Sequence, residues 1–98
     1  MNVHSDVENV IGGSGDDLIV GDPSSNHLYG GPGNDTLWGG GGNDTLEGGH
    51  GQDQLFGQGG DDLLIARDKT QDTLDGGDGI DSTSCDSVDV LWNVEKVF

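Results

Sequence analysis

Residues 30–47 read GGPGNDTLWGGGGNDTLE, which is one phrase of nine residues written twice. Both copies, GGPGNDTLW and GGGGNDTLE, have glycine at positions one, two and four, aspartate at position six and leucine at position eight. Similarity at a fixed short period is typical of repeat architectures, in which each repeat packs only against its neighbours. The fold is therefore decided by how far this phrase extends along the chain.

The phrase continues in both directions and covers residues 12–84. GGSGDDLIV and GDPSSNHLY precede the quoted stretch, and GGHGQDQLF, GQGGDDLLI, RDKTQDTLD and GGDGIDSTS follow it. Position eight is apolar in the first seven units, at Ile19, Leu28, Leu37, Leu46, Leu55, Leu64 and Leu74. Position six is Asp17, Asn26, Asp35, Asp44, Asp53, Asp62, Asp72 and Asp81. Both series slip by one residue at the same place, which indicates a single insertion near Ala66.

Composition limits the class of protein. The chain has 98 residues, enough for one domain, with 20 glycines and a formal net charge of −16. Without its order, such a composition is typical of a disordered acidic chain, but disorder does not keep an apolar residue in phase. The acidity argues against nucleic acid and anionic membrane surfaces and favours cations. No apolar run approaches the roughly 18 residues of a membrane-spanning helix.

The nine positions divide into a turn and a short strand. Positions seven to nine, such as 36–38, alternate across a strand, so the apolar position eight faces inward and position nine faces outward. Glycines at positions one, two and four permit positive φ, which lets the turn fold tightly and its carbonyls converge. Carbonyl oxygens together with the carboxylate of position six form a set of hard oxygen ligands suited to Ca²⁺. A zinc site is not expected, because His4, His27 and His50 share no register and the chain has one cysteine.

These units resemble the nonapeptide arrays of the RTX (repeats in toxin) family over residues 12–84. The resemblance implies an all-β fold, a right-handed parallel β-roll with 18 residues and two units per turn. Odd units then stack on one side and even units on the other, with calcium between stacked loops. One loop gives its second and fourth carbonyls, the next gives its first and third, and both give the aspartate.

Carried onto this sequence, the resemblance implies four complete calcium sites. The first file of loops has two of them: Gly13, Gly15, Asp17, Gly30, Pro32 and Asp35, and then Gly31, Gly33, Asp35, Gly48, His50 and Asp53. The second file has the other two: Gly40, Gly42, Asp44, Gly57, Gly59 and Asp62, and then Gln58, Gly60, Asp62, Gly76, Asp78 and Asp81. Asp35 and Asp62 are each shared by two sites and are expected to bridge two ions.

Two further positions between stacked loops depart from the pattern. Unit two has Asp22 and Ser24 where glycines are usual and Asn26 in place of aspartate, so its site with unit four is expected to be weak or empty. Unit seven has no glycine and carries Arg67 and Lys69. Its site with unit five is expected to rely on Asp72 alone or to be replaced by a cation of the protein.

The array has distinct ends. Residues 1–11 are expected to lead into it, and residues 85–98 to form a C-terminal cap or the start of a further array. VENVI at 7–11 and VEKVF at 94–98 are nearly the same phrase, which suggests that the chain is an excerpt of a longer protein. Cys85 cannot form an internal disulfide, and a small buried side chain is as good an interpretation as a reactive thiol.

The resemblance implies a calcium-binding module of a secreted, extracellular protein rather than an enzyme. Such a module would fold on binding Ca²⁺ and assist the secretion, folding or stability of neighbouring domains in a longer parent protein. Adjacent carboxylates such as 16–17 and 61–62 need no catalytic explanation, because the repeat accounts for the second of each pair.

The alternative function is recognition of a polysaccharide or a protein. The observation that favours it is an outer stripe of apolar residues at position nine of the odd units, Val20, Trp38 and Phe56. Three interpretations of this stripe remain open. The C-terminal segment around Leu91 and Trp92 docks on it, or it mediates self-association or binds a partner. Alternatively it has no partner, because scattered exposed apolar residues are normal.

Overall fold

The structure is a computed structural model that describes residues 2–4, 9–21, 23, 25–66, 70–85, 90–92 and 96–97. Twelve short strands lie within these residues. They are β1 Asn2–His4, β2 Asn9–Ile11, β3 Leu18–Val20, β4 His27–Tyr29, β5 Thr36–Trp38, β6 Thr45–Glu47, β7 Gln54–Phe56, β8 Leu63–Ala66, β9 Thr73–Asp75, β10 Ser82–Cys85, β11 Val90–Trp92 and β12 Lys96–Val97. None of the described residues forms a helix that could span a membrane.

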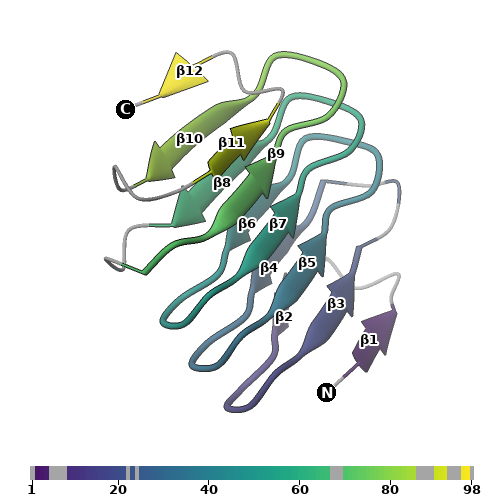
Figure 1. The fold of residues 1–98 in the computed structure, drawn as a ribbon. Helices are drawn as coiled ribbons and strands as arrows, with labels where there is room; N and C mark the ends of the chain where they lie inside the picture. The colour runs from purple at the N-terminus through teal and green to yellow at the C-terminus, as the bar shows by residue number, and fades with distance from the viewer. Residues whose placement is uncertain are drawn as a thin grey trace.

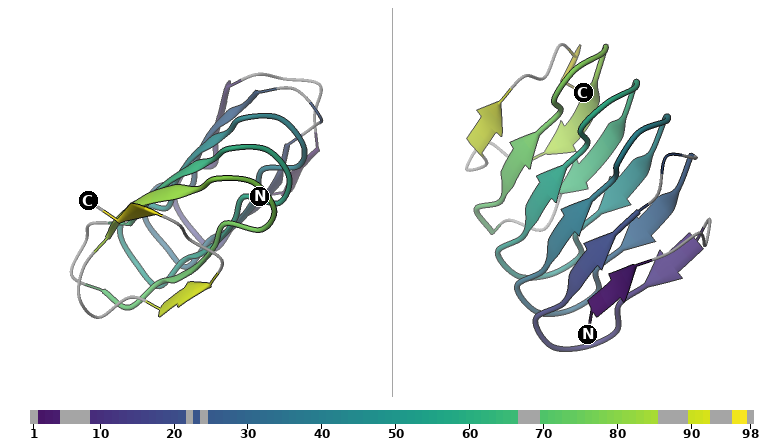
Figure 2. Two further views of the ribbon diagram at one scale, coloured as in Figure 1. Left: turned by 90° about the horizontal axis from the view of Figure 1, so that it is seen from above. Right: turned by 90° about the vertical axis from the view of Figure 1, so that its right-hand side faces the viewer.

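The strands form two parallel sheets that face each other (Figure 1). Sheet A has the order β1-β3-β5-β7-β9-β11, and sheet B has the order β12-β10-β8-β6-β4-β2. Successive strands along the chain therefore belong to opposite sheets, and each pair of units completes one turn (Figure 2). The predicted all-β parallel β-roll, with odd and even units on opposite sides, is confirmed.

The register follows the period of the sequence. Leu37 pairs with Ile19 and with Leu55, each 18 residues away, as two nonapeptides per turn require. Past the insertion the step becomes 19, and Leu55 pairs with Leu74. The extra residue lengthens β8, whose last residue, Ala66, is buried. The slip inferred from the sequence is thus taken up at the end of one strand, and both sheets stay in phase.

The core is a single layer of side chains between the sheets. The molecule measures 32 × 29 × 14 Å, and the short dimension leaves room for one layer because facing sheets pack about 10 Å apart. Every position-eight side chain from Ile19 to Leu74 is fully buried, as predicted. In the last unit position eight is Thr83, which is also fully buried, and its Oγ1 donates a hydrogen bond to the Leu64 carbonyl at 3.0 Å. That bond satisfies the hydroxyl that replaces the methyl groups of leucine.

Strands extend beyond the glycine-rich units at both ends of the roll. At one end, β1 and β2 pair with β3 and β4, and at the other, β11 and β12 pair with β9 and β10. The C-terminal strands therefore lengthen the sheets and do not lie across their outer faces (Figures 1 and 2). Parts of the two end phrases, at 7–8, 94–95 and 98, and the side chain of Cys85 lie outside the described residues.

Glycine serves two different purposes in the turns. Positive φ occurs at positions two and four, for example 88° at Gly31 and 113° at Gly33. The glycines of position one do not adopt positive φ, so the expectation that all three glycines are needed for backbone conformation is wrong at that position. Gln58 occupies a position two with φ of 68° and is the one non-glycine residue with positive φ in the described part of the chain.

Substitution by alanine should have very different effects on stability at two adjacent glycines of one loop. A Cβ on Gly59 would come no closer than 4.0 Å to its nearest neighbour, whereas on Gly60, at φ +84°, it would lie 2.6 Å from the carbonyl carbon of Gly42. We expect Gly59→Ala to change the free energy of unfolding by less than about 0.5 kcal/mol and Gly60→Ala to lower it by more than about 2 kcal/mol. Urea unfolding in saturating calcium measures both, and equal effects would contradict this stacking of the loops.

Candidate metal centre

The six-residue turns stack in two files at opposite edges of the roll (Figure 1). The first file contains the turns at 12–17, 30–35 and 48–53, which lead from sheet B into sheet A. The second contains those at 21–26, 39–44, 57–62 and 76–81, which lead from sheet A into sheet B. Each turn thus lies directly against the turn two units away, as a site shared by two turns requires.

The aspartates of position six are buried at the inner side of these turns and link them. The backbone N–H of Asp17 donates a hydrogen bond to Oδ1 of Asp35 at 2.8 Å, and Asp35 donates in the same way to Asp53 at 2.8 Å. The second file repeats the bond from Asp44 to Asp62 and from Asp62 to Asp81. One carboxylate oxygen of each acceptor aspartate therefore holds neighbouring turns in register.

The space occupied by Oδ2 explains the glycine of position one. A Cβ placed on Gly30 would lie 2.5 Å from Oδ2 of Asp35 and 2.8 Å from the carbonyl oxygen of Gly48. Two oxygens from neighbouring turns, a carboxylate and a carbonyl, therefore converge on the point that a side chain at position one would fill. This is the physical reason for a glycine whose φ is ordinary.

The same convergence occurs at four places. In each, the carboxylate of one unit and the position-one carbonyl of the next unit in the same file lie within 3 Å of one point. The pairs are Asp17 with Gly30, Asp35 with Gly48, Asp44 with Gly57 and Asp62 with Gly76. Each pair consists of two residues from one of the four predicted ligand sets.

Two of these carboxylates have an oxygen that the protein does not satisfy. Oδ2 of Asp35 and Oδ2 of Asp62 are buried and accept no hydrogen bond. A buried carboxylate oxygen without a donor is costly unless a cation pairs with it. Within the described residues, no three His, Cys, Asp or Glu side chains come together. A cation here would therefore be held by a pair of aspartates and by backbone carbonyls, which suits Ca²⁺ better than zinc.

The pKa values of the shared aspartates reflect the same burial. Desolvation raises the pKa of Asp62 to about 7, with smaller contributions from the negative charges of Asp44 and Asp81. Burial also raises the pKa of Asp35, to which the charge of Asp17 adds. Without a bound cation, the ionised form of these groups is disfavoured in the folded chain.

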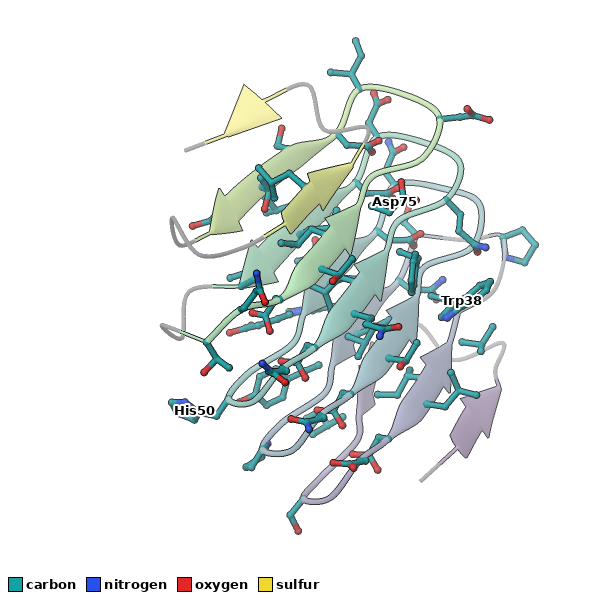
Figure 3. The ribbon with its side chains drawn as sticks, viewed as in Figure 1. Trp38, His50 and Asp75 are labelled. Atoms are coloured by element: carbon teal, nitrogen blue, oxygen red, sulfur yellow. The ribbon has the colours of Figure 1, made fainter. Side chains whose placement is uncertain are left out.

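The remaining predicted ligands are placed for their carbonyls alone. Pro32, His50, Gln58 and Asp78 are exposed, and the side chain of His50 points away from the roll (Figure 3). The residues with buried carboxylates, in contrast, are the position-six aspartates. The side chains of these four predicted backbone ligands are thus exposed, whereas the predicted carboxylate ligands are buried.

Of the two irregular units, unit two differs from the others at the corresponding point. Beside Gly21, the carbonyl of Gly39 faces the Nδ2 amide nitrogen of Asn26 where the other turns present a carboxylate oxygen. An amide nitrogen is a donor and cannot bind a cation. At Gly48, Oδ2 of Asp53 lies at the usual place, and the carbonyl that the repeat would place opposite it belongs to residue 67, outside the described residues. The expectations for Asp22, Ser24, Arg67 and Lys69 fall outside the described residues.

The structure also contains a ladder that was not predicted. Short polar side chains at position five accept a hydrogen bond from the backbone N–H at position five of the next turn in the file. Asp16 accepts from Asn34 at 2.8 Å, Asn34 from Gln52 at 2.9 Å, and Asp61 from Ile80 at 2.9 Å. Its sequence signal was the run of Asp, Ser and Asn at position five, which explains the first member of each acidic pair.

The family model for the RTX calcium-binding nonapeptide repeat (4 copies) matches residues 5–37 and 29–64. The chain belongs to this family. Its predicted membership is confirmed, and the RTX module is a calcium-binding structural repeat rather than a member of an enzyme family. A search of curated proteins found no match to the chain.

Acid should partly replace calcium in this RTX module. The pKa of Asp62 is about 7 when folded and about 3.9 when unfolded, so its contribution to stability is fully present below pH 4 and is lost as the pH rises through 7. In excess chelator, circular dichroism should therefore show more β structure at pH 5.5 than at pH 7.5. Asp62→Asn should reduce this difference, and an unchanged or reversed pH response would contradict the pKa assignment.

Proposed function

We propose that the chain binds at least four Ca²⁺, two in each file of turns, and folds when it does so. The observation that carries this proposal is the fourfold convergence of a buried carboxylate and a carbonyl on the point vacated by a position-one glycine. Membership of the RTX family supplies the identity of the cation. The four ligand sets are those given by the resemblance, and the buried aspartates supply their negative charge.

Calcium would act on the electrostatic cost of folding. The formal charge of the chain is −16, and the position-six aspartates stack at the spacing of neighbouring strands, about 4.8 Å. Four Ca²⁺ would reduce this charge to −8. A site held at 100 times its dissociation constant stabilises the fold by about 2.7 kcal/mol, so four would add about 11 kcal/mol, comparable to the stability of a whole domain.

The stability supplied by bound calcium would make folding depend on whether the chain is inside or outside the cell. Extracellular calcium modules bind at about 10⁻⁴–10⁻³ M, so the chain would remain unfolded in a calcium-poor cytosol and fold outside the cell. An RTX module of this kind would assist the secretion, folding or stability of the neighbouring domains of a longer extracellular protein.

A second candidate function, recognition of a partner, has a specific observation in its favour. Val20, Trp38 and Phe56 are register partners on the outer face of sheet A, and the rings of Trp38 and Phe56 are 5.2 Å apart between centroids. On sheet B the equivalent residues are Tyr29, Glu47 and Ile65, where a charge interrupts the apolar series. An exposed aromatic pair beside a rigid scaffold is a common feature of binding sites.

The number of calcium ions lost on substitution tests the shared ligands. Asp35→Asn and Asp81→Asn are matched changes, because both side chains are buried and both accept a backbone N–H through Oδ1. Asp35 would bridge two ions and Asp81 would bind one, so calorimetry should show two sites weakened by the first change and one by the second. Equal losses would contradict the bridging assignment.

A calcium titration tests the folding switch. In excess chelator at pH 7.5 we expect little β signal in circular dichroism, and a cooperative increase as Ca²⁺ reaches about 10⁻⁴–10⁻³ M. Mg²⁺ at the same concentration should have a smaller effect, because it requires octahedral geometry and loses its water reluctantly. A full β signal in chelator would refute calcium-dependent folding without affecting family membership.

A further inference from the structure

A pocket of about 310 Å³ opens at the corner where the outer face of sheet A meets the second file of turns. Trp38, Phe56 and Asp75 line it from the last positions of β5, β7 and β9. Gln58 and Asp78 line it from the turns that follow β7 and β9. Gln58, Gly59 and Asp78 are also members of the predicted calcium sites, to which they would give backbone carbonyls, and the side chains of Gln58 and Asp78 are exposed.

One wall of the pocket is aromatic. The ring planes of Trp38 and Phe56 are inclined by 48°, and 40% of Trp38 remains exposed. The contact with Phe56 fixes the indole against the sheet and leaves it accessible to a ligand. An indole face in this situation attracts cations and flat groups.

The end of the pocket beyond Phe56 is acidic. Asp75 continues the series of position-nine residues after Phe56, and its Oδ1 accepts the N–H of Gly77 at 3.0 Å, which orients the carboxylate. Asp78 is exposed on the adjacent turn. Figure 3 shows Trp38 and Asp75 on the same sheet, each at the arrowhead of its strand. None of the described residues that line the pocket is basic.

The ligand that fits both parts of the pocket carries a planar cation. A guanidinium group stacks on an indole and also donates forked hydrogen bonds to carboxylates. A compact ammonium group stacks on an indole less well. A neutral sugar could stack on Trp38 but would not use the two charges. An acidic polysaccharide would be repelled by a chain of charge −16.

We propose that this pocket binds an arginine side chain presented by a segment of a partner protein. The guanidinium stacks on Trp38 and pairs with Asp75 and Asp78. The pocket joins turns 57–60 and 76–79, whose stacking is part of the proposed calcium-dependent fold, so recognition requires the folded module. Calcium thereby controls access to a partner as well as the fold.

Nuclear magnetic resonance of the Trp38 indole tests the proposal. The folded module, in saturating calcium with its β signal verified beforehand, is titrated with the capped peptide Gly-Gly-Arg-Gly-Gly. The matched probe replaces arginine with citrulline, which has the same shape without the charge, and a neutral glucan hexasaccharide represents a sugar ligand. We expect the arginine peptide to shift the indole resonance and the citrulline peptide to bind about fivefold more weakly or worse.

Two variants remove one negative charge each. Asp75→Asn keeps an oxygen for the N–H of Gly77 and should weaken arginine binding by about threefold or more, whereas Glu47→Gln, at the equivalent position of sheet B, should change it by less than about twofold. Equal losses in the two variants would reduce the effect to overall charge and overturn the proposal. So would equal binding of citrulline, a shift with the glucan alone, or no shift with any probe. Because the β signal is verified first, these outcomes are distinct from failure of calcium-dependent folding.

Discussion

The roll depends on a buried carboxylate that recurs along each file of turns. In Asp35, Asp53 and Asp62, one oxygen accepts an N–H from the preceding turn, and the other points to the space that a position-one side chain would fill. The same group thus sets the register between turns and supplies negative charge where carbonyls converge. A buried charge opposes folding unless it is neutralised, so a cation becomes part of the structural design.

The linkage of neighbouring turns by buried carboxylates explains why a small hydrophobic core suffices for this fold. The core is a single layer of small aliphatic side chains in a molecule 14 Å thick, and hydrophobic residues are 30% of the chain. A layer of this size cannot order many glycine-rich turns without help, because glycine loses more conformational entropy on folding than any other residue. Ladders at positions five and six provide part of the cohesion that a thicker core would otherwise supply, and the proposed cations between the turns would provide more.

Much of this was predictable from the sequence. The period of nine predicted the inward position eight and the location of the insertion, because side chains alternate across a strand. The two sheets were predicted from the resemblance to RTX arrays. The role of the first glycine was misassigned, since sequence cannot distinguish a glycine required for φ from one required for space. The position-five ladder and the pocket between Trp38 and Asp75 were also missed, because each depends on distances between turns that only coordinates provide.

The lengthened strand β8 has a consequence for how such chains change in length. Its additional residue, Ala66, lies after position nine, outside the acceptors of positions five and six and outside the vacated space at position one. An insertion at this corner therefore leaves the position-six hydrogen bond from the N–H of Asp53 to Oδ1 of Asp72 in place. An insertion between positions five and eight would instead rotate leucine outward and aspartate away from its acceptor role. Natural insertions in such arrays should accordingly concentrate after position nine of a unit, where the strand ends and the next turn begins.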